Sequence, residues 1–308
     1  MSRWRWLMLA PLVSLTACDP QKIILQGITD AQSAYFTPPD GVDDLLEEVT
    51  DGVYSYRLGF ERNLVIDTPD GWVIVDCFSE EFAEGLHAAL KKQAPDKRVK
   101  ALIYSHYHLD HITGGAVLEP EEVVAPSIVR SYWADLDVSE VLPPTHWWNG
   151  DGQLAYGGVA IDAVYLGRSH TDTLYAFHVP SKGVLFTPDS AFVRMIPPGG
   201  LPQTYAPGHI RALDRMLSLS FEHWVPSHGW DLGTPEQLRE FRDMVVYTRE
   251  ICDAQVRRHG LFPDGETRAQ MLFETLEPFE ERYGDWYGFD AQAVPWLGRH
   301  FVGVGIGY

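Results

Sequence analysis

The chain has 308 residues, 45% of them hydrophobic, and a formal net charge of −19 at pH 7. This length fits one large α/β domain with an N-terminal extension, and the hydrophobic fraction is ordinary for a protein that buries a core. A surface this acidic repels phosphate backbones, which argues against nucleic acid as substrate or partner.

The first eighteen residues have the pattern of an export signal rather than of folded structure. Arg3 and Arg5 precede an apolar stretch, residues 7–17, that is shorter than the about 20 residues needed to span a bilayer. The stretch ends before Cys18 and resembles the lipobox of bacterial lipoproteins, which implies acylation of Cys18 and stable membrane anchoring. Asp19 resembles an inner-membrane retention signal, so we expect a lipoprotein at the periplasmic face of the inner membrane. A plain secretory signal and an uncleaved anchor are the alternatives.

Regular structure is expected to begin near Val53, after a lead-in of mixed polarity that covers residues 19–50. Ser79 is the expected N-cap of the first long helix, with acidic residues in its first turn. Hydrophobic alternation and apolar runs predict four strands around this helix, at residues 53–58, 64–66, 72–75 and 99–104. The last run is nearly continuous, as expected of a strand that is buried on both faces.

The second half of the chain repeats this mixture of strands and helices. Thr234 followed by Pro235 predicts the start of a long helix, and the chain beyond Pro263 is expected to be helical with a glycine-rich tail. The other expected elements are a helix at 127–136, hairpins at 153–166 and 174–186, a helix at 209–219 and a strand at 223–225. Two comparable halves predict an α/β fold of two sheets packed face to face with helices outside.

A cluster of potential metal ligands directly follows the predicted strand at 99–104. Three histidines and one aspartate fall within six positions: His106, His108, Asp110 and His111. A loop at a strand end can turn such side chains toward one point. Imidazole nitrogen suits zinc and a carboxylate adds an oxygen ligand, so the sequence predicts a metal site here.

The pattern His106-x-His108-x-Asp110-His111 resembles the H-x-H-x-D-H motif of the metallo-β-lactamase superfamily. His170, Asp189 and His228 each follow a predicted strand and resemble the later metal ligands of that family. The resemblance covers roughly residues 52–235. It implies an αββα four-layer sandwich, with a catalytic domain at 51–235 and a helical C-terminal extension at 236–308 packed on the same domain.

The resemblance also implies how the ligands divide between two metal ions. One ion would be held by three histidines, the second by two histidines and an aspartate, and a further aspartate would bridge them: His106, His108 and His170; Asp110, His111 and His228; and Asp189. Asp76 resembles a family aspartate that supports the metal loop without binding metal itself.

Such a site implies hydrolysis of a small ester, thioester, lactone or lactam by water that two zinc ions activate. Asp110 is also the candidate catalytic group, because a free carboxylate oxygen could orient the attacking water or move its proton. Manganese or iron could take the place of zinc. The chain contains no G-x-S-x-G motif that would indicate a serine nucleophile instead.

Two other functions stay open, a single-iron dioxygenase-like enzyme and a zinc-binding lipoprotein that does not hydrolyse anything. His108 stands where the diiron flavoproteins of this fold carry glutamate, which favours hydrolysis over redox chemistry. Asp189 stands where one large group of true β-lactamases carries cysteine. The chain therefore looks more similar to glyoxalase II, acyl-homoserine lactonases and phosphodiesterase-type members.

Three aromatic residues in Pro- and Gly-rich loops are candidates for the substrate pocket: Trp148, Tyr205 and Trp230. Cys77 and Cys252 lack the spacing of a redox or zinc motif and are expected to be buried thiols. An export compartment would also permit a disulfide between them. The sequence leaves the small-molecule substrate and the oligomeric state undefined.

Overall fold

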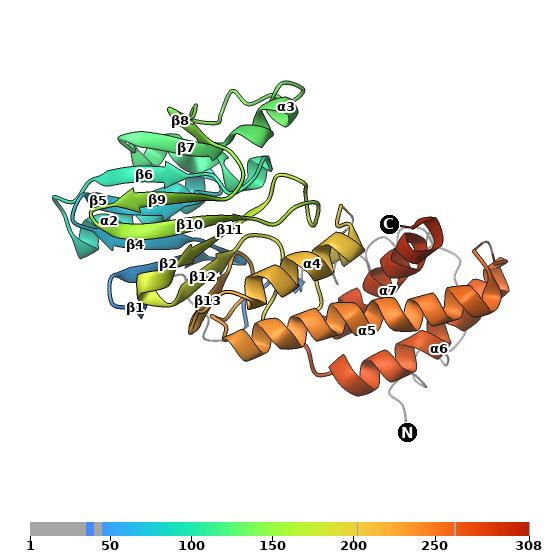
Figure 1. Cartoon of the computed structure of the whole chain (residues 1–308). Coiled ribbons are helices and arrows are strands. Elements are labelled where there is room, and N and C mark those ends of the chain that lie inside the picture. The colour runs from blue at the N-terminus through green and yellow to red at the C-terminus, as the bar shows by residue number, and fades with distance from the viewer. Residues whose placement is uncertain (1–34, 40–44, 202, 262, 308) are drawn as a thin grey trace, which may run out of the picture. The chain divides into compact units, whose positions relative to one another are not determined.

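The computed structural model describes residues 35–39, 45–201, 203–261 and 263–307 (Figure 1). Residues 1–37 form one unit and residues 38–308 a second unit, which carries the sheets and the helices discussed below. The expected export signal, Cys18 and much of the lead-in lie outside the described residues. In the part of the chain that is described, no helix has the length and apolar character needed to cross a membrane.

The first half of the large unit forms an eight-stranded sheet, ordered β1-β2-β4-β5-β6-β7-β8 with β3 paired to β2. Its strands are β1 (Leu45–Thr50), β2 (Val53–Leu58), β3 (Glu61–Arg62), β4 (Leu64–Thr68), β5 (Gly71–Val75), β6 (Val99–Ile103), β7 (Glu122–Pro126) and β8 (His146–Trp148). β5, β6, β7 and β8 run parallel to one another. β1 lies within the stretch expected to be an irregular lead-in, and it pairs antiparallel with β2.

The second half forms a five-stranded sheet, ordered β13-β12-β11-β10-β9. Its strands are β9 (Gly152–Tyr156), β10 (Val159–Tyr165), β11 (Tyr175–Val179), β12 (Val184–Thr187) and β13 (His223–Pro226). β10 and β12 are both antiparallel to β11, and β12 is parallel to β13. β10, β12 and β13 therefore end at the same edge of the sheet.

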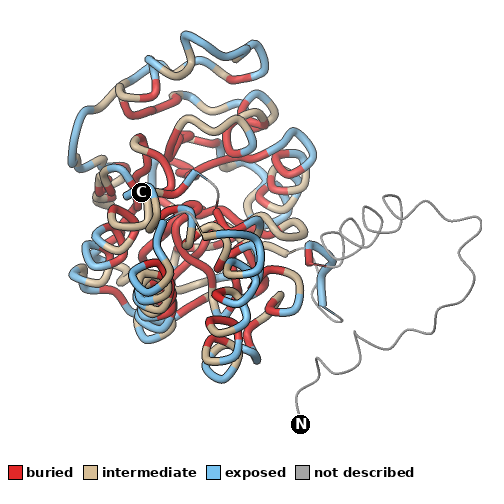
Figure 2. Tube along the Cα trace, turned by 90° about the vertical axis from the view of Figure 1, so that its right-hand side faces the viewer, coloured by how far each residue is buried: buried red, intermediate tan, exposed pale blue. Residues whose placement is uncertain are grey.

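Two layers of apolar side chains hold this unit together, as the predicted sandwich requires. Between the sheets, Val73 and Ile103 pack with Phe177 and Phe186. On the outer face of the first sheet, alternate strand residues pack against the apolar stripe of α2 (Glu80–Gln93). Ser79 caps α2 by accepting a hydrogen bond from the Phe82 backbone nitrogen at 3.2 Å. The buried segments run through the middle of the unit (Figure 2).

The remaining helices are α3 (Arg130–Trp133), α4 (Ala206–Leu217), α5 (Pro235–His259), α6 (Gly265–Tyr283) and α7 (Phe289–Ile306). α4 and α5 lie beside β13 (Figure 1), and the expected helical C-terminal region is confirmed. Thr234 and Gln237 form the predicted capping box at the start of α5. The chain beyond Pro263 was expected to be helical with a glycine-rich tail, and α7 continues through Gly303 and Gly305 to Ile306.

The helix expected at 127–136 is only a 3₁₀ turn, Ser127–Val129, followed by the one-turn helix α3.

The two cysteines of the described residues, Cys77 and Cys252, are both buried free thiols. Burial raises the pKa of each thiol far above its ordinary value, so neither has the reactive thiolate form near neutral pH.

Candidate metal centre

The histidines of the sequence cluster follow β6, whereas the later ligand candidates follow strands of the other sheet. His170 follows β10, Asp189 follows β12 and His228 follows β13. Because these three strands end at one edge, their loops converge there. His106 and His111 reach the same place from the first sheet, and the candidate ligands thus come from both halves of the unit.

Asp189 lies at the centre of five imidazole rings. Its Oδ2 faces three nitrogens, at 3.5 Å from His106 Nε2, 3.9 Å from His108 Nδ1 and 3.2 Å from His170 Nε2. Its Oδ1 faces two, at 3.0 Å from His111 Nε2 and 2.7 Å from His228 Nε2. Within each of these two sets, the potential ligand atoms lie within 4.8 Å of one another. The two oxygens of one carboxylate therefore face two separate sets of nitrogen donors.

The chemistry of these donors fits bound cations. The Nε2 atoms of His106 and His111 are buried and lack a hydrogen-bond partner. Burial lowers the pKa of His106 well below its ordinary value, which keeps the ring neutral and its lone pair available. Burial opposes ionisation of Asp189, but the positive charges of His111 and His228 outweigh it and hold the pKa of that carboxyl well below its usual range. Burial likewise lowers the pKa of His111, but the carboxylates of Asp189 and Asp76 outweigh it and raise that pKa well above its ordinary value, so a cation bound there would replace the proton on Nε2. A buried carboxylate that faces unpartnered imidazole nitrogens is a typical metal-binding arrangement.

Asp76 sits behind two of these rings and is fully buried. Its Oδ2 accepts hydrogen bonds from His111 Nδ1 at 3.1 Å and from Ser105 Oγ at 2.6 Å, and its Oδ1 accepts one from the Ser105 backbone nitrogen at 2.9 Å. Ser105 Oγ in turn lies 2.8 Å from His106 Nδ1. This network places protons on the Nδ1 atoms of both rings and leaves their Nε2 atoms directed at Asp189.

Both buried carboxylates occupy backbone conformations that few residues other than glycine adopt. The φ angle is 61° at Asp76 and 47° at Asp189. Aspartate tolerates this left-handed region better than most residues, and such conformations persist where the surroundings enforce them. Here the Asp189 backbone nitrogen donates to Ser227 Oγ at 2.9 Å, and that hydroxyl donates to Asp189 Oδ1 at 3.0 Å.

Two residues that support the ligand cluster, Gln203 and His209, belong to no sequence motif. His108 Nε2 donates to Gln203 Oε1 at 2.8 Å, which leaves Nδ1 of the ring to face Asp189. His209 Nε2 donates to the carbonyl oxygen of Ser190 at 2.5 Å. Ser190 directly follows Asp189 in the chain, so this bond holds the backbone next to that carboxylate. Burial lowers the pKa of His209 to about 4, so its ring is neutral near pH 7. In each of these two hydrogen bonds the donor and the acceptor lie far apart in the sequence, so no local pattern predicts the contact.

Asp110, expected as a ligand and as the catalytic group, lies outside both ligand sets of the described residues. It is exposed, on the short 3₁₀ turn Leu109–His111. Near it lies Glu61 of β3, which the sequence did not indicate. Burial raises the pKa of Glu61 and Asp110 adds to this effect, whereas His228 and His111 lower it. The second ligand set thus has two carboxylates beside it rather than the one expected.

A cleft of about 450 Å³ opens beside His170 and is lined mainly by polar side chains, among them Tyr107, Tyr132, Arg168 and Gln203. The Tyr107 and Tyr132 rings stack with centroids 4.3 Å apart, and Tyr132 donates to Asp172 Oδ1 at 2.5 Å. This cleft borders the ligand cluster through His170.

The three aromatic candidates for the substrate pocket occupy different environments. Trp148 packs edge-on against Tyr175, at 5.3 Å between ring centroids, and contacts the core between the sheets. The Tyr205 ring lies under the Arg168 guanidinium at 4.7 Å. Trp230 packs at 5.5 Å against Phe60, whose ring stacks on His228 at 5.3 Å. None of the three belongs to the lining of the cleft beside His170.

Sequence comparison identifies one domain family and a small group of characterised proteins. The model of the metallo-β-lactamase superfamily matches residues 58–228. The 2,4-dinitroanisole O-demethylase subunit alpha of Nocardioides sp. (strain JS1661) is 29% identical over 262 residues, which cover 82% of this chain and 75% of that protein. The linear primary-alkylsulfatase of Pseudomonas sp. (strain ATCC 19151) is 26% identical over 296 residues, which cover 78% of this chain and 55% of that protein.

Comparison with solved structures gives the same fold. A metallo-β-lactamase from Pontibacter korlensis matches with a TM-score of 0.58 at 19% identity, over 66% of this chain and 99% of that chain. The stereoselective inverting sec-alkylsulfatase from Pseudomonas sp. matches with a TM-score of 0.67 at 16% identity, over 84% of this chain and 50% of that chain. The chain therefore spans about half the length of the alkylsulfatases that it matches.

Proposed function

The chain belongs to the metallo-β-lactamase superfamily, and from this premise we propose that it is a hydrolase that uses two divalent metal ions, zinc in the first instance. The observation that carries the proposal is the position of Asp189, whose two oxygens face two separate sets of imidazole nitrogens. A single-iron enzyme or a simple zinc carrier would not need a carboxylate shared in this way.

The ligand sets define which residues would hold each ion. His106, His108 and His170 would hold one with Asp189 Oδ2, and His111 and His228 would hold the other with Asp189 Oδ1. When bound, such a pair of ions supplies Lewis acidity and lowers the pKa of water enough for attack near neutral pH.

The surrounding residues would prepare this chemistry. Asp76 and Gln203 fix the proton on the outward nitrogens of His111 and His108, so the inward nitrogens keep their lone pairs. Glu61 and Asp110 lie beside the second ligand set, and one of these carboxylates would accept a proton from the attacking water. The ring of Phe78, 4.5 Å from that of His111, packs an apolar surface against this ligand.

The proposed substrates are small carboxylic esters, thioesters, lactones, lactams and sulfate esters. The last class is suggested by the linear primary-alkylsulfatase relative, whose name describes cleavage of alkyl sulfates. The guanidinium of Arg168 in the cleft beside His170 would attract a negatively charged group of a substrate. This local attraction would offset the general repulsion of anions by a protein of net charge −19.

The test combines metal analysis with a substrate screen. Protein purified without chelator should contain about two metal equivalents, and it should hydrolyse at least one of a nitrophenyl carboxylic ester, a nitrophenyl sulfate, a thioester, a lactone and a β-lactam. Asp189→Ala should lose both metal and turnover, whereas His146→Ala, a substitution of an exposed histidine outside the cluster, should keep them. Turnover that survives both chelation and Asp189→Ala would refute the proposal.

We also propose that Cys18 is acylated and holds the protein at the periplasmic face of the inner membrane. The support is the lipobox-like sequence that ends at Cys18 and the aspartate that follows it. Labelling of cells with a radioactive fatty acid should mark the protein and fail for Cys18→Ser, which should appear in the soluble periplasmic fraction. An unlabelled wild-type protein would disprove the anchor.

A further inference from the structure

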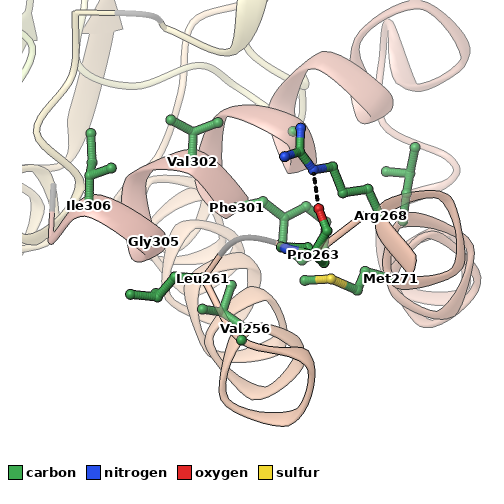
Figure 3. A pocket seen from close by; sticks show the side chains of 12 residues that line it. Val256, Leu261, Pro263, Arg268, Met271, Phe301, Val302, Gly305 and Ile306 are labelled. Atoms are coloured by element: carbon green, nitrogen blue, oxygen red, sulfur yellow. Dashed lines mark hydrogen bonds between the residues drawn. The ribbon is translucent and has the colours of Figure 1, made fainter. Parts of the chain in front are cut away.

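A second pocket, about 400 Å³ in volume, opens between α5, α6 and α7 (Figure 3). None of these helices supplies a residue to the ligand sets described above. Apart from one arginine the lining is apolar, and it includes Val256, Leu261, Met271, Phe301, Val302 and Ile306. Its volume falls within the range of about 300–1,000 Å³ that is typical of small-molecule sites.

Two glycines of α7 keep one wall of this pocket free of side chains. A Cβ added at Gly298 or Gly305 would meet no atom within 4 Å, so packing within the described chain does not require glycine at either position. Glycine is the least favourable residue in a helix after proline. These positions therefore weaken α7 and leave open a space that larger side chains would otherwise fill.

Arg268 is the single ionisable residue of the lining. Its Nε donates to the carbonyl oxygen of Pro263 at 3.0 Å, which holds the guanidinium in the lining of the pocket (Figure 3). The nearby Arg257 and Arg258 form ion pairs with carboxylates, whereas no carboxylate of the described residues lies within ion-pair distance of Arg268. The pKa of Asp264 is lowered mainly by hydrogen bonds at the start of α6, and the charge of Arg268 adds to this effect. A fixed cation beside an apolar cavity is the complement of an anionic group joined to an apolar chain.

We propose that this pocket binds a single-chain amphiphile with an anionic headgroup, such as a fatty acid or an alkyl sulfate. The headgroup lies on Arg268, and the chain fills the apolar interior along the wall formed by Gly298 and Gly305. The occupied pocket also covers the exposed rim residues Leu261, at 55% exposure, and Val302, at 59%. A second copy of the chain fits this rim poorly, because two molecules of charge −19 repel each other.

The strength of binding should depend on chain length in a defined way. Each additional buried methylene should tighten binding about fourfold until the pocket is full. Decanoate should therefore bind about 16-fold more tightly than octanoate. Decyl maltoside, which has no charge, and decyltrimethylammonium, which has the wrong one, should bind more weakly than decanoate and decyl sulfate.

The test is a calorimetric titration of the metal-loaded protein with these amphiphiles below their micelle concentrations. Gly298→Leu places its Cβ in open space and directs the side chain into the pocket, so it should abolish binding of all of them, and its thermal unfolding checks that the fold is intact. Gly265→Leu, at a helical glycine that also has open space but lies outside the pocket, is the matched control and should bind normally. Arg268→Gln should weaken binding of the two anions at least tenfold and leave decyl maltoside unchanged.

The same titration on Asp189→Ala separates this pocket from the metal centre, because binding at the pocket should persist when the metals are lost. The inference is independent of the proposed hydrolase activity for this reason. Undiminished binding to Gly298→Leu, or an anion preference that survives Arg268→Gln, would overturn it. So would a stable dimer that forms without amphiphile and prevents its binding.

Discussion

Replacing Asp76 by asparagine changes the proton positions on two imidazole rings at once. The Oδ1 atom of Asp76 accepts from the Ser105 backbone nitrogen, a donor that cannot reverse its role. The amide oxygen of asparagine must therefore stay on that side, and the amide NH₂ must face His111 Nδ1 and Ser105 Oγ. His111 then has to move its proton to Nε2, the atom that faces Asp189 Oδ1 at 3.0 Å.

The size of the effect follows from the two rings that Asp76 supports. Loss of such a supporting partner commonly weakens metal binding about 10- to 100-fold, which corresponds to about 1.4–2.7 kcal/mol. Asp76 contacts His111 directly and His106 through Ser105, so each of the two ligand sets contains one affected ring. We therefore expect both metal equivalents to bind more weakly to Asp76→Asn.

Calorimetric titration of metal-free protein with zinc measures the two affinities separately, and Ser105→Ala is the matched control. That substitution disconnects His106 from Asp76 but leaves the contact between Asp76 and His111 in place. Only the equivalent bound by the His106 set should weaken in Ser105→Ala. If folded Asp76→Asn binds two zinc ions with the affinity of the parent protein, the proton-placement argument is refuted.

Three further predictions test other contacts. Gln203→Ala removes the acceptor of the His108 Nε2 proton, and it should weaken one metal equivalent up to about tenfold in a zinc titration. Gly208→Ala would place a Cβ 1.7 Å from the Arg168 carbonyl oxygen, so urea unfolding should show a loss of about 1–3 kcal/mol. Burial lowers the pKa of His300 to about 3 from an ordinary 6.5. Its contribution to stability is thus complete above pH 6.5 and falls as the pH drops toward 3, by about 3 kcal/mol at pH 4.5. His300→Leu should flatten this acid limb in urea unfolding.

Local patterns predicted most of the sandwich because hydrophobic periodicity reports directly on burial. Residues 99–104 read as a strand buried on both faces, and β6 is such a strand. β1 was missed because its residues are mostly half-buried and carry Glu47, which pairs with the buried Arg62 of β3. That contact forms only in the folded chain. The helix α7 continues through the glycines of the expected glycine-rich tail, since glycine weakens a helix without ending it.

At the metal centre, too, the sequence indicated residues that are close together in the chain and missed contacts that form only in the folded protein. His106, His108 and His111 fall in one short loop, so their spacing alone predicts a ligand cluster. Gln203 reaches the cluster from a loop and Glu61 from strand β3, both through contacts that depend on the tertiary fold. The family resemblance indicated the ligands and one residue that orients them, Asp76, but Gln203 and Glu61 belong to no motif.

Because the ligands come from both sheets, metal binding should affect the stability of the fold and its resistance to proteolysis. His106, His108 and His111 belong to one half of the sandwich, and His170, Asp189 and His228 to the other. Cations bound among these residues would link the two halves of the sandwich, so part of the free energy of metal binding would stabilise the folded state. Scarcity of metal should then shorten the lifetime of the chain against proteases as well as stop its chemistry.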